Sequence, residues 1–293
     1  MTQLKIIKAP LSKREAAAAF IAKMNAKEEQ HIGYCGTDRK EILHTLKENL
    51  SDIPFTESFI IATHKEEIRG LIGFDADSGN HSAEIWGPFI QDPYTHQLPK
   101  LWEHLLALLP SLSYSLSLFS NKKNTLVNRF AEQQGFVLQS EQTILKMDCR
   151  TPLNVMNLSD YEITPEFFMD MEKLHDEIFP STYYSGSQII ERVNAHRKVF
   201  IHTEDNKLAG YIFVEVEPEF GEASIEFFAV KDSERRKGIG AMLLQKGVSW
   251  IFTFQGIEAI NLCVDSANRK AISLYQKVGF YIQHELNYYV KKS

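Results

Sequence analysis

The amino-acid sequence predicts an α/β fold that occurs twice along the chain. Apolar segments of strand length and helix length alternate, and both halves show one order: strand, two helices, three strands, helix, strand, helix, strand. A landmark also recurs, because Gly279-Phe280 follows Gly135-Phe136 by 144 residues. A repeat of this length predicts two tandem domains, residues 1–150 and residues 151–293.

The elements of the first half follow from local patterns. Leu116 and Leu118 alternate with serines, which is typical of a half-buried strand, and Ile42 and Leu46 share one side of a helix. Pro110 cannot continue the helix that precedes it. We expect strands at residues 4–8, 58–63, 70–74, 82–90, 113–119 and 137–147, and helices at residues 12–24, 38–50, 98–109 and 124–134.

The second half repeats this order. We expect strands at residues 153–157, 198–203, 208–216, 223–230, 259–264 and beyond residue 280, and helices at residues 165–179, 187–196 and 268–277 and after Gly238. The helix after Gly238 has an apolar stripe of Ile239, Met242, Leu243 and Trp250, with the stem of Lys246 between them.

The stretch from Phe227 to Leu244 organises the second half. It reads as an apolar strand, a charged turn, Gly238-x-Gly240 and an apolar helix. Glycines let a ligand approach the backbone, and the first N–H groups of a helix lack partners at the positive end of its dipole. Basic residues at 235–237 add positive charge. These features predict a cradle for a phosphate or a diphosphate, formed by the N–H groups of residues 236–241.

Two common phosphate-binding loops can be excluded. The chain has no GxxxxGK[ST] sequence, so this is not a Walker A loop. The dinucleotide fingerprint GxGxxG fails because Leu243 stands where its third glycine would be. The pattern that does fit is Arg235-x-x-Gly238-x-Gly240, although the loop alone also fits a solvated basic turn before an ordinary helix.

A second motif follows this loop. Asn268 begins a predicted helix, Ala271 lies three residues on, Leu274-Tyr275 follows, and Gly279-Phe280 closes the helix. The two motifs, in this order and spacing, resemble the signatures of the GNAT superfamily of N-acetyltransferases. The resemblance covers about residues 152–292 and, with the repeat, implies two tandem acyl-CoA N-acyltransferase domains, each an α/β domain with a mixed sheet.

The resemblance also implies acetyl-CoA as the acyl donor. The diphosphate would lie on the loop, and the strand before it would bind the pantetheine arm. Tyr275 would be the general acid that protonates the leaving thiolate, with a core aromatic as the alternative. Asn268 would contact the cofactor and could cap its helix as well. The expected cofactor-binding residues are Phe228, Val230, Arg235, Arg236, Lys237, Gly238, Ile239, Gly240, Ala241, Asn268 and Tyr275.

Glu226 is the candidate general base. A carboxylate within an apolar strand is costly unless it faces a cleft or a partner, although Glu226 could instead lie on a solvated strand face. The other candidates are Glu222, Glu215 and Glu217. The resemblance places the acceptor against the first helix pair and the final strands, which gives His175, Glu177, Phe179, Tyr183, Tyr184, Tyr288 and Tyr289. The aromatic run near Tyr183 could instead form the seam with the first domain.

The first half lacks these chemical groups. Opposite the loop, residues 92–100 contain no glycine and two prolines, which have no N–H to offer a phosphate. Ala131 stands opposite Tyr275 and cannot donate a proton. We therefore expect residues 1–150 to be a degenerate copy without cofactor, the alternative being an unrelated α/β domain.

Composition and charge indicate which ligands and which cell compartment to expect. The chain has 293 residues and a net charge of -6, which argues against general nucleic-acid binding. Its three cysteines lie far apart without metal spacing, so we expect no metal and a reducing, cytoplasmic location. No apolar run is long enough to span a membrane. We expect a monomer or homodimer.

The predicted function is transfer of an acetyl group from acetyl-CoA to a primary amine of a small molecule or peptide, by direct attack in a ternary complex. The alternative is a non-catalytic protein that binds acyl-CoA or regulates a partner. Tyr275 favours the enzyme, because it occurs in the copy that has the loop and is absent from the other.

Overall fold

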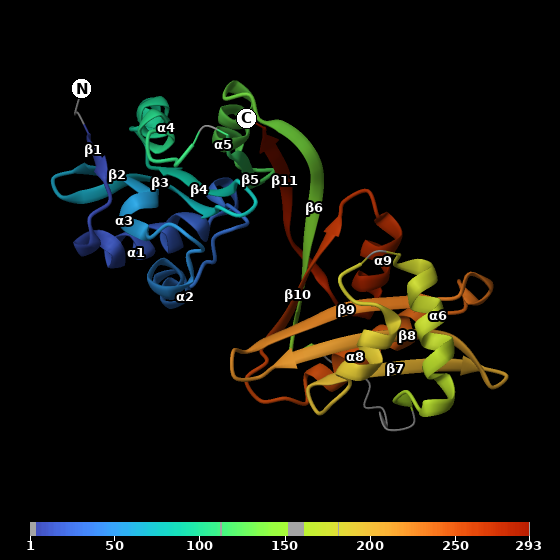
Figure 1. Cartoon of the computed structure of the whole chain (residues 1–293). Coiled ribbons are helices and arrows are strands. Elements are labelled where there is room, and N and C mark those ends of the chain that lie inside the picture. Colours follow the sequence, from blue (N-terminus) through green and yellow to red (C-terminus); the bar gives the residue numbers. More distant parts are fainter. Residues whose placement is uncertain (1–3, 112, 152–160, 181, 293) are drawn as a thin grey trace. The chain divides into compact units, whose positions relative to one another are not determined.

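The computed structural model describes residues 4–111, 113–151, 161–180 and 182–292. The strand expected at residues 153–157 lies outside the described residues. The chain divides into two compact units: unit 1 contains Met1–Gln142 and His284–Ser293, and unit 2 contains Thr143–Gln283. Each unit combines helices with β-strands (Figure 1). Strand β6, Val137–Asp148, and strand β11, Tyr281–Lys291, each contribute residues to both units.

Unit 1 is a mixed sheet with helices on both faces. Strands β1 to β4 are antiparallel neighbours, and β4 pairs in parallel with β5 through Ser82–Glu84 and Ser115–Ser117. Helices α4 and α5 lie on one face, and α1 and α2 on the other (Figure 1). Its strands are β1 Lys5–Lys8, β2 Phe59–His64, β3 Glu67–Asp77, β4 Ser82–Ile90 and β5 Ser115–Asn121, and its helices are α1 Arg14–Asn25, α2 Arg39–His44, α3 Phe55–Ser58, α4 Leu98–Leu106 and α5 Thr125–Gln133.

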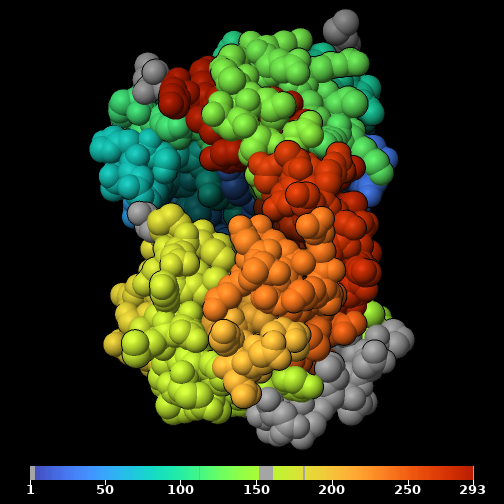
Figure 2. Space-filling view, turned by 90° about the vertical axis from the view of Figure 1, so that its right-hand side faces the viewer, coloured from blue at the N-terminus to red at the C-terminus, as the bar shows by residue number. Residues whose placement is uncertain are grey.

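Unit 2 is built around the antiparallel sheet β7-β8-β9. Figure 2 shows yellow, orange and orange-red segments of this unit packed together on one face. Its strands are β7 Arg197–Glu204, β8 Lys207–Glu217, β9 Glu222–Val230 and β10 Ala259–Asp265, and its helices are α6 Phe168–Ile178, α7 Gly186–Arg192, α8 Ile239–Ile251 and α9 Arg269–Val278.

The two faces of sheet β7-β8-β9 form separate cores. Because side chains alternate along a strand, Tyr211 and Phe213 of β8 face α6 and α7, whereas Ile212 and Val214 face α8 and α9. Helix α8 buries Leu243 in the second core, at a position that the predicted stripe contains. The loop of residues 231–238 joins the end of β9 in this sheet to the start of α8.

The units exchange their last strands. Residues 286–291 of β11 pair antiparallel with residues 116–121 of β5, so the C-terminal strand of the chain completes the sheet of unit 1. Strand β6 follows α5 in the chain but runs on into unit 2, where its neighbour is β10. The units therefore do not follow the expected boundary near residue 150, because two long unbroken strands cross between them.

Several element ends differ from the expected ranges. The helix expected at residues 38–50 ends at His44 and continues as one wider π-type turn, Thr45–Asn49. The helix expected at residues 187–196 stops at Arg192, and short 3-10 turns precede α1, α4 and α6. The segment beyond residue 280 is one continuous strand.

Lys246 is a charged residue inside the unit 2 core. Its side chain is buried, and its Nζ lies 3.1 Å from the centroid of the Tyr161 ring without a hydrogen-bond partner among the described residues. Burial lowers the Lys246 pKa from 10.5 to about 8.

Lys246→Met is expected to stabilise the protein at pH 7 by roughly 1–2 kcal/mol, because methionine fills similar space without a buried charge. Between pH 8 and 10.5 the lysine binds more protons in the unfolded state than in the folded state. The free energy of unfolding of the wild type therefore rises relative to that of the variant across this pH range. Thermal unfolding of both proteins at pH 7 and pH 10 tests this. An equal difference in Tm at both pH values would contradict it.

Candidate active site

The loop between β9 and α8 presents a row of free backbone donors. A 3-10 turn at Asp232–Glu234 satisfies the N–H of Arg235, and the N–H of Met242 donates to the Gly238 carbonyl. Between them, the N–H groups of residues 236–241 donate to no group among the described residues. No side chain caps α8 either. These are the donors at the positive end of a helix dipole that suit an anion.

Backbone geometry keeps this loop open. Arg236 has φ +69° and Gly238 has φ +86°, and such left-handed residues turn successive N–H groups toward one side. A Cβ built on Gly238 would have no heavy atom within 4 Å, so a ligand can reach the backbone there. A Cβ on Gly240 would lie 3.3 Å from Leu274 Cδ2, so this glycine permits close packing of α8 against α9.

The basic side chains of the loop are exposed and partly neutralised. Arg235 pairs with Asp232 at 2.7 Å, and Lys237 pairs with Glu234 at 2.7 Å. The hydrogen bond and charge of Glu234 raise the pKa of Lys237. Arg236 forms no ion pair with a described residue, so its charge is fully available to an incoming anion.

Strand β9 is an edge strand beside this loop. The N–H of Lys231 donates to the Ala209 carbonyl, so by antiparallel alternation the N–H and C=O groups of Phe228 and Val230 point away from β8. Strand β10, the next strand along the chain, belongs to another sheet. The Val230 carbonyl accepts a hydrogen bond from Arg235 Nε at 3.4 Å. The backbone groups of Phe228 and the N–H of Val230 have no partner among the described residues.

Glu226 lies at a β-bulge in β9. Phe213 pairs with Phe227 and Val214 pairs with Ile225, so Glu226 is an extra residue without a partner on β8. Its carboxylate accepts a hydrogen bond from the Tyr183 hydroxyl. Burial, followed by this hydrogen bond and the nearby carboxylate charge, raises the pKa of Tyr183.

Tyr275 projects from α9 into the core beside β9. Its ring packs edge-on against Phe228 and Phe280, with centroids 6.1 Å and 5.5 Å away. Burial raises the pKa of Tyr275 to about 12, so the phenol keeps its proton at neutral pH. Its hydroxyl has no hydrogen-bond partner among the residues described. Asn268 caps α9, because its side chain accepts from the Ala271 N–H at 3.1 Å.

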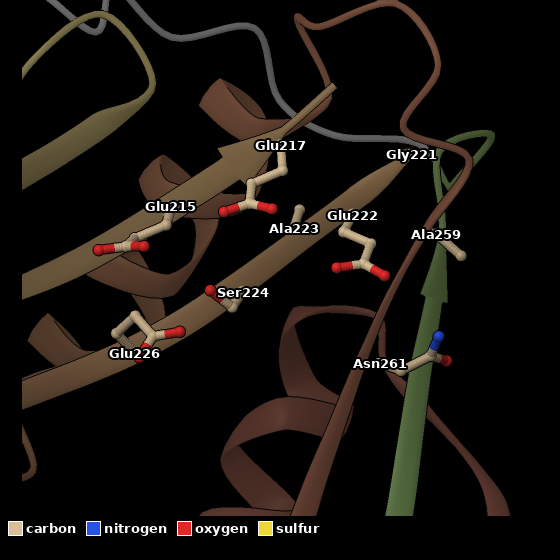
Figure 3. A pocket seen from close by; sticks show the side chains of 9 residues that line it. All are labelled: Glu215, Glu217, Gly221, Glu222, Ala223, Ser224, Glu226, Ala259 and Asn261. Carbon is tan, nitrogen blue, oxygen red and sulfur yellow. The ribbon is translucent and has the colours of Figure 1, made fainter. Parts of the chain in front are cut away.

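An acidic pocket lies at the opposite end of β9 from the loop. It has a volume of about 420 Å³. Figure 3 shows glutamates of β8 and β9 along it, with Asn261 of β10 nearby. All four candidate bases line it: Glu215, Glu217, Glu222 and Glu226. Glu215 forms ion pairs with Arg192 and Arg197 at 3.4 and 3.2 Å, so its carboxylate already has two partners.

Comparison with known proteins identifies one segment of the chain. Residues 168–280 match the model of the acetyltransferase (GNAT) family. This segment is a GNAT domain. No curated protein matches the chain.

Solved structures show that the whole chain has the mixed α/β fold of GNAT acyltransferases. A GCN5-related N-acetyltransferase from Sphaerobacter thermophilus aligns with a TM-score of 0.63 and 14% identity, over 99% of this chain and 95% of that one. A tandem GNAT protein from the clavulanic acid biosynthesis pathway aligns at 0.57 and 12%, over 99% and 98%. A putative acetyltransferase from Pyrococcus horikoshii aligns at 0.51 and 13%, over 100% and 90%.

The residues expected to surround the acceptor separate into different environments. His175 of the GNAT domain is buried, donates through Nε2 to the Tyr184 carbonyl at 2.9 Å, and hydrogen bonds through Nδ1 with the Tyr211 hydroxyl at 2.5 Å. Both ring nitrogens are thus used in the core. Tyr288 and Tyr289 belong to unit 1, where they pair with β5. Tyr183 is exposed, and its hydroxyl donates a hydrogen bond to Glu226. No other described residue of this group forms a hydrogen bond with Glu226.

Unit 1 differs from the GNAT domain at the start of α4, the position that corresponds to the loop between β9 and α8. The N–H of Gln97 donates to the Tyr94 carbonyl and that of Leu98 to Thr95, and Pro99 has no N–H. Leu98 is also buried. The start of α4 therefore offers few donors for an anion.

Among the described residues, no group of three or more His, Cys, Asp or Glu side chains is arranged to hold a metal ion. The described helices include none of the length and apolarity needed to cross a membrane. The described cysteines Cys35, Cys149 and Cys263 form no disulfide.

Proposed function

We propose that unit 2 transfers an acetyl group from acetyl-CoA to a primary amine of a small molecule or peptide. The observation that carries this proposal is the row of free N–H groups at residues 236–241, in a GNAT domain, next to the free N–H groups of Phe228 and Val230 in β9. Donors for a diphosphate and donors for an amide-containing arm are thereby adjacent along the chain.

The residues present fit acetyl-CoA. The N–H groups from Arg236 to Ala241 would hold its diphosphate, with the open space at Gly238 admitting it and the unpaired Arg236 side chain adding charge. Arg235 and Lys237 would add to this charge if they exchanged their carboxylate partners for the diphosphate. The free backbone groups of Phe228 and the free N–H of Val230 would bind the pantetheine arm, and the Val230 carbonyl would do so after Arg235 Nε leaves it. Asn268 would contact the cofactor from the start of α9 while it caps that helix. Bound acetyl-CoA supplies the acetyl group as a thioester.

Two side chains would move protons. Glu226 would take a proton from the attacking amine, directly or through water, at the carboxylate that Tyr183 already orients. The Tyr275 hydroxyl would give its proton to the departing sulfur as the C–S bond breaks, which its raised pKa permits throughout neutral pH. Backbone N–H groups of β9 would stabilise the carbonyl oxygen as it gains charge.

Unit 1 would be a degenerate copy without cofactor. The N–H groups at residues 97–99 are either hydrogen-bonded or missing, which supports the absence of a cofactor site in unit 1. Strand β11 completes the sheet of unit 1, which supports a structural role for this unit. We also propose a cytoplasmic protein that works as a monomer or homodimer.

A binding experiment and a turnover experiment together test the proposal. Acetyl-CoA is expected to raise the Tm of the full chain, and thiol release in the presence of a panel of primary amines is expected to exceed release without amine. Stabilisation without amine-dependent release would favour the non-catalytic acyl-CoA-binding alternative. Absence of both would refute the proposal.

A further inference from the structure

The pocket beside Glu226 has an arrangement of charge that β-structure alone does not favour. Glu217 of β8 stands directly opposite Glu222 of β9 in the strand register, and Glu215 stands opposite Ser224. Like charges in directly opposed positions of an antiparallel pair destabilise it. All these side chains lie on one face of β8 and β9, toward the pocket (Figure 3).

The glutamates of this pocket divide by their partners. Glu215 is neutralised by Arg192 and Arg197, and Glu226 is fixed by the Tyr183 hydroxyl. Glu217 and Glu222 form no ion pair with a described residue. The pocket therefore keeps two uncompensated carboxylates near its outer end, in addition to the carboxylate at the bulge.

We propose that this pocket selects an acceptor with at least two positive charges, of the aliphatic diamine or polyamine class. This inference rests on the proposed acetyltransferase function. The amine to be acetylated lies at Glu226, and the second ammonium group lies between Glu217 and Glu222. A cation there relieves the repulsion of the opposed carboxylates and gains two charge-assisted contacts.

Two features beyond the acidic residues support this assignment. The pocket volume of about 420 Å³ accommodates a small aliphatic chain, and the pocket extends from the bulge to the β8–β9 turn. The hydrogen bond from Tyr183 gives Glu226 an environment different from that of the outer pair, so the two ends of the pocket can serve different amines.

The reaction balances with groups already assigned. The reacting ammonium group loses one proton to Glu226, which passes it to solvent, and the resulting amine forms the new C–N bond. As the C–S bond of the thioester breaks, Tyr275 gives its proton to the sulfur, and the second proton lost by the nitrogen restores the Tyr275 hydroxyl. The second ammonium group keeps its proton and its charge, and leaves with the product. The product is a monoacetylated amine with one positive charge fewer, which binds this pocket less tightly.

Acetylation of matched amines by the full chain tests the assignment. Putrescine and spermidine are compared with butylamine, which has the chain length of putrescine and one charge. Wild-type kcat/KM is expected to be at least tenfold higher for putrescine. The double variant Glu217→Gln/Glu222→Gln is expected to raise KM for putrescine about tenfold or more, with a much smaller change in kcat. Glu219→Gln, in the same turn but outside the pocket lining, is the matched control and keeps the wild-type KM.

The outcomes separate this inference from the proposed function. Acetyl-CoA binding and acetylation of butylamine as efficient as that of putrescine would overturn the inference and leave the acetyltransferase intact. An unchanged putrescine KM in the double variant would overturn it as well. Failure to bind acetyl-CoA would overturn the proposed function itself. The putrescine preference is also expected to shrink between 0.05 M and 0.5 M salt, because screening weakens the outer contact.

Discussion

Replacing Gly238 with alanine is expected to weaken acetyl-CoA binding at least tenfold. Gly238 has φ +86°, a conformation that an L-residue adopts only at a cost, and its missing Cβ leaves open the space in front of the free N–H groups. Alanine both strains the loop and occupies that space. Isothermal titration of each protein with acetyl-CoA measures the change.

Gly135 provides a matched control for this variant. It has φ +80°, no heavy atom within 4 Å of a built Cβ, and a position after helix α5 in unit 1. Gly135→Ala is expected to lose a similar amount of stability while acetyl-CoA affinity stays within about twofold of wild type. Equal acetyl-CoA affinity in the two variants would show that Gly238 does not contribute to acetyl-CoA binding.

Tyr275→Phe is expected to lower kcat by roughly 10²-fold while the acetyl-CoA dissociation constant changes little. The ring contacts with Phe228 and Phe280 survive the change, and only the hydroxyl is lost. Because burial raises the Tyr275 pKa to about 12, the wild-type enzyme is expected to show no loss of rate from this group between pH 7 and pH 10. Steady-state rates across that range, with binding measured separately, check both statements.

Tyr281→Phe is the control for the loss of a phenol. Tyr281 is exposed and donates to Asp148 at 2.9 Å, far along the chain from the loop. Its variant is expected to keep wild-type turnover. If Tyr275→Phe also kept full turnover, Tyr275 would be a core aromatic and another group would protonate the sulfur.

Local patterns predict the elements that carry the candidate site. The strand expected at residues 223–230 is β9, Glu222–Val230, and the helix expected at residues 268–277 is α9, Arg269–Val278. Asn268 caps α9 as its position suggests. These features depend on short-range chemistry, namely side-chain alternation, glycine backbone freedom and capping, which a single sequence displays.

Features that depend on distant pairing could not be predicted in this way. Periodicity indicates that residues after 280 form a strand, but in a repeated fold it does not indicate which copy receives that strand. The structure pairs β11 with β5, so Tyr288 and Tyr289 lie in unit 1. The expected division near residue 150 misses this exchange for the same reason.

The environment of Glu226 also needed the structure. A β-bulge is visible only when two strands are aligned, and the extra residue in β9 appears from the pairing of Phe213 with Phe227 and Val214 with Ile225. The hydrogen bond from Tyr183 joins residues 43 positions apart. The aromatic run near Tyr183 signalled that this loop is unusual, but not which carboxylate it meets.

A crystal structure of the full chain with acetyl-CoA tests the central claim most directly. We predict the diphosphate on the N–H groups of residues 236–241 and the pantetheine arm along Phe228–Val230, with the thioester sulfur within hydrogen-bond reach of the Tyr275 hydroxyl. A cofactor bound elsewhere, such as at residues 92–98 of unit 1, would contradict the account.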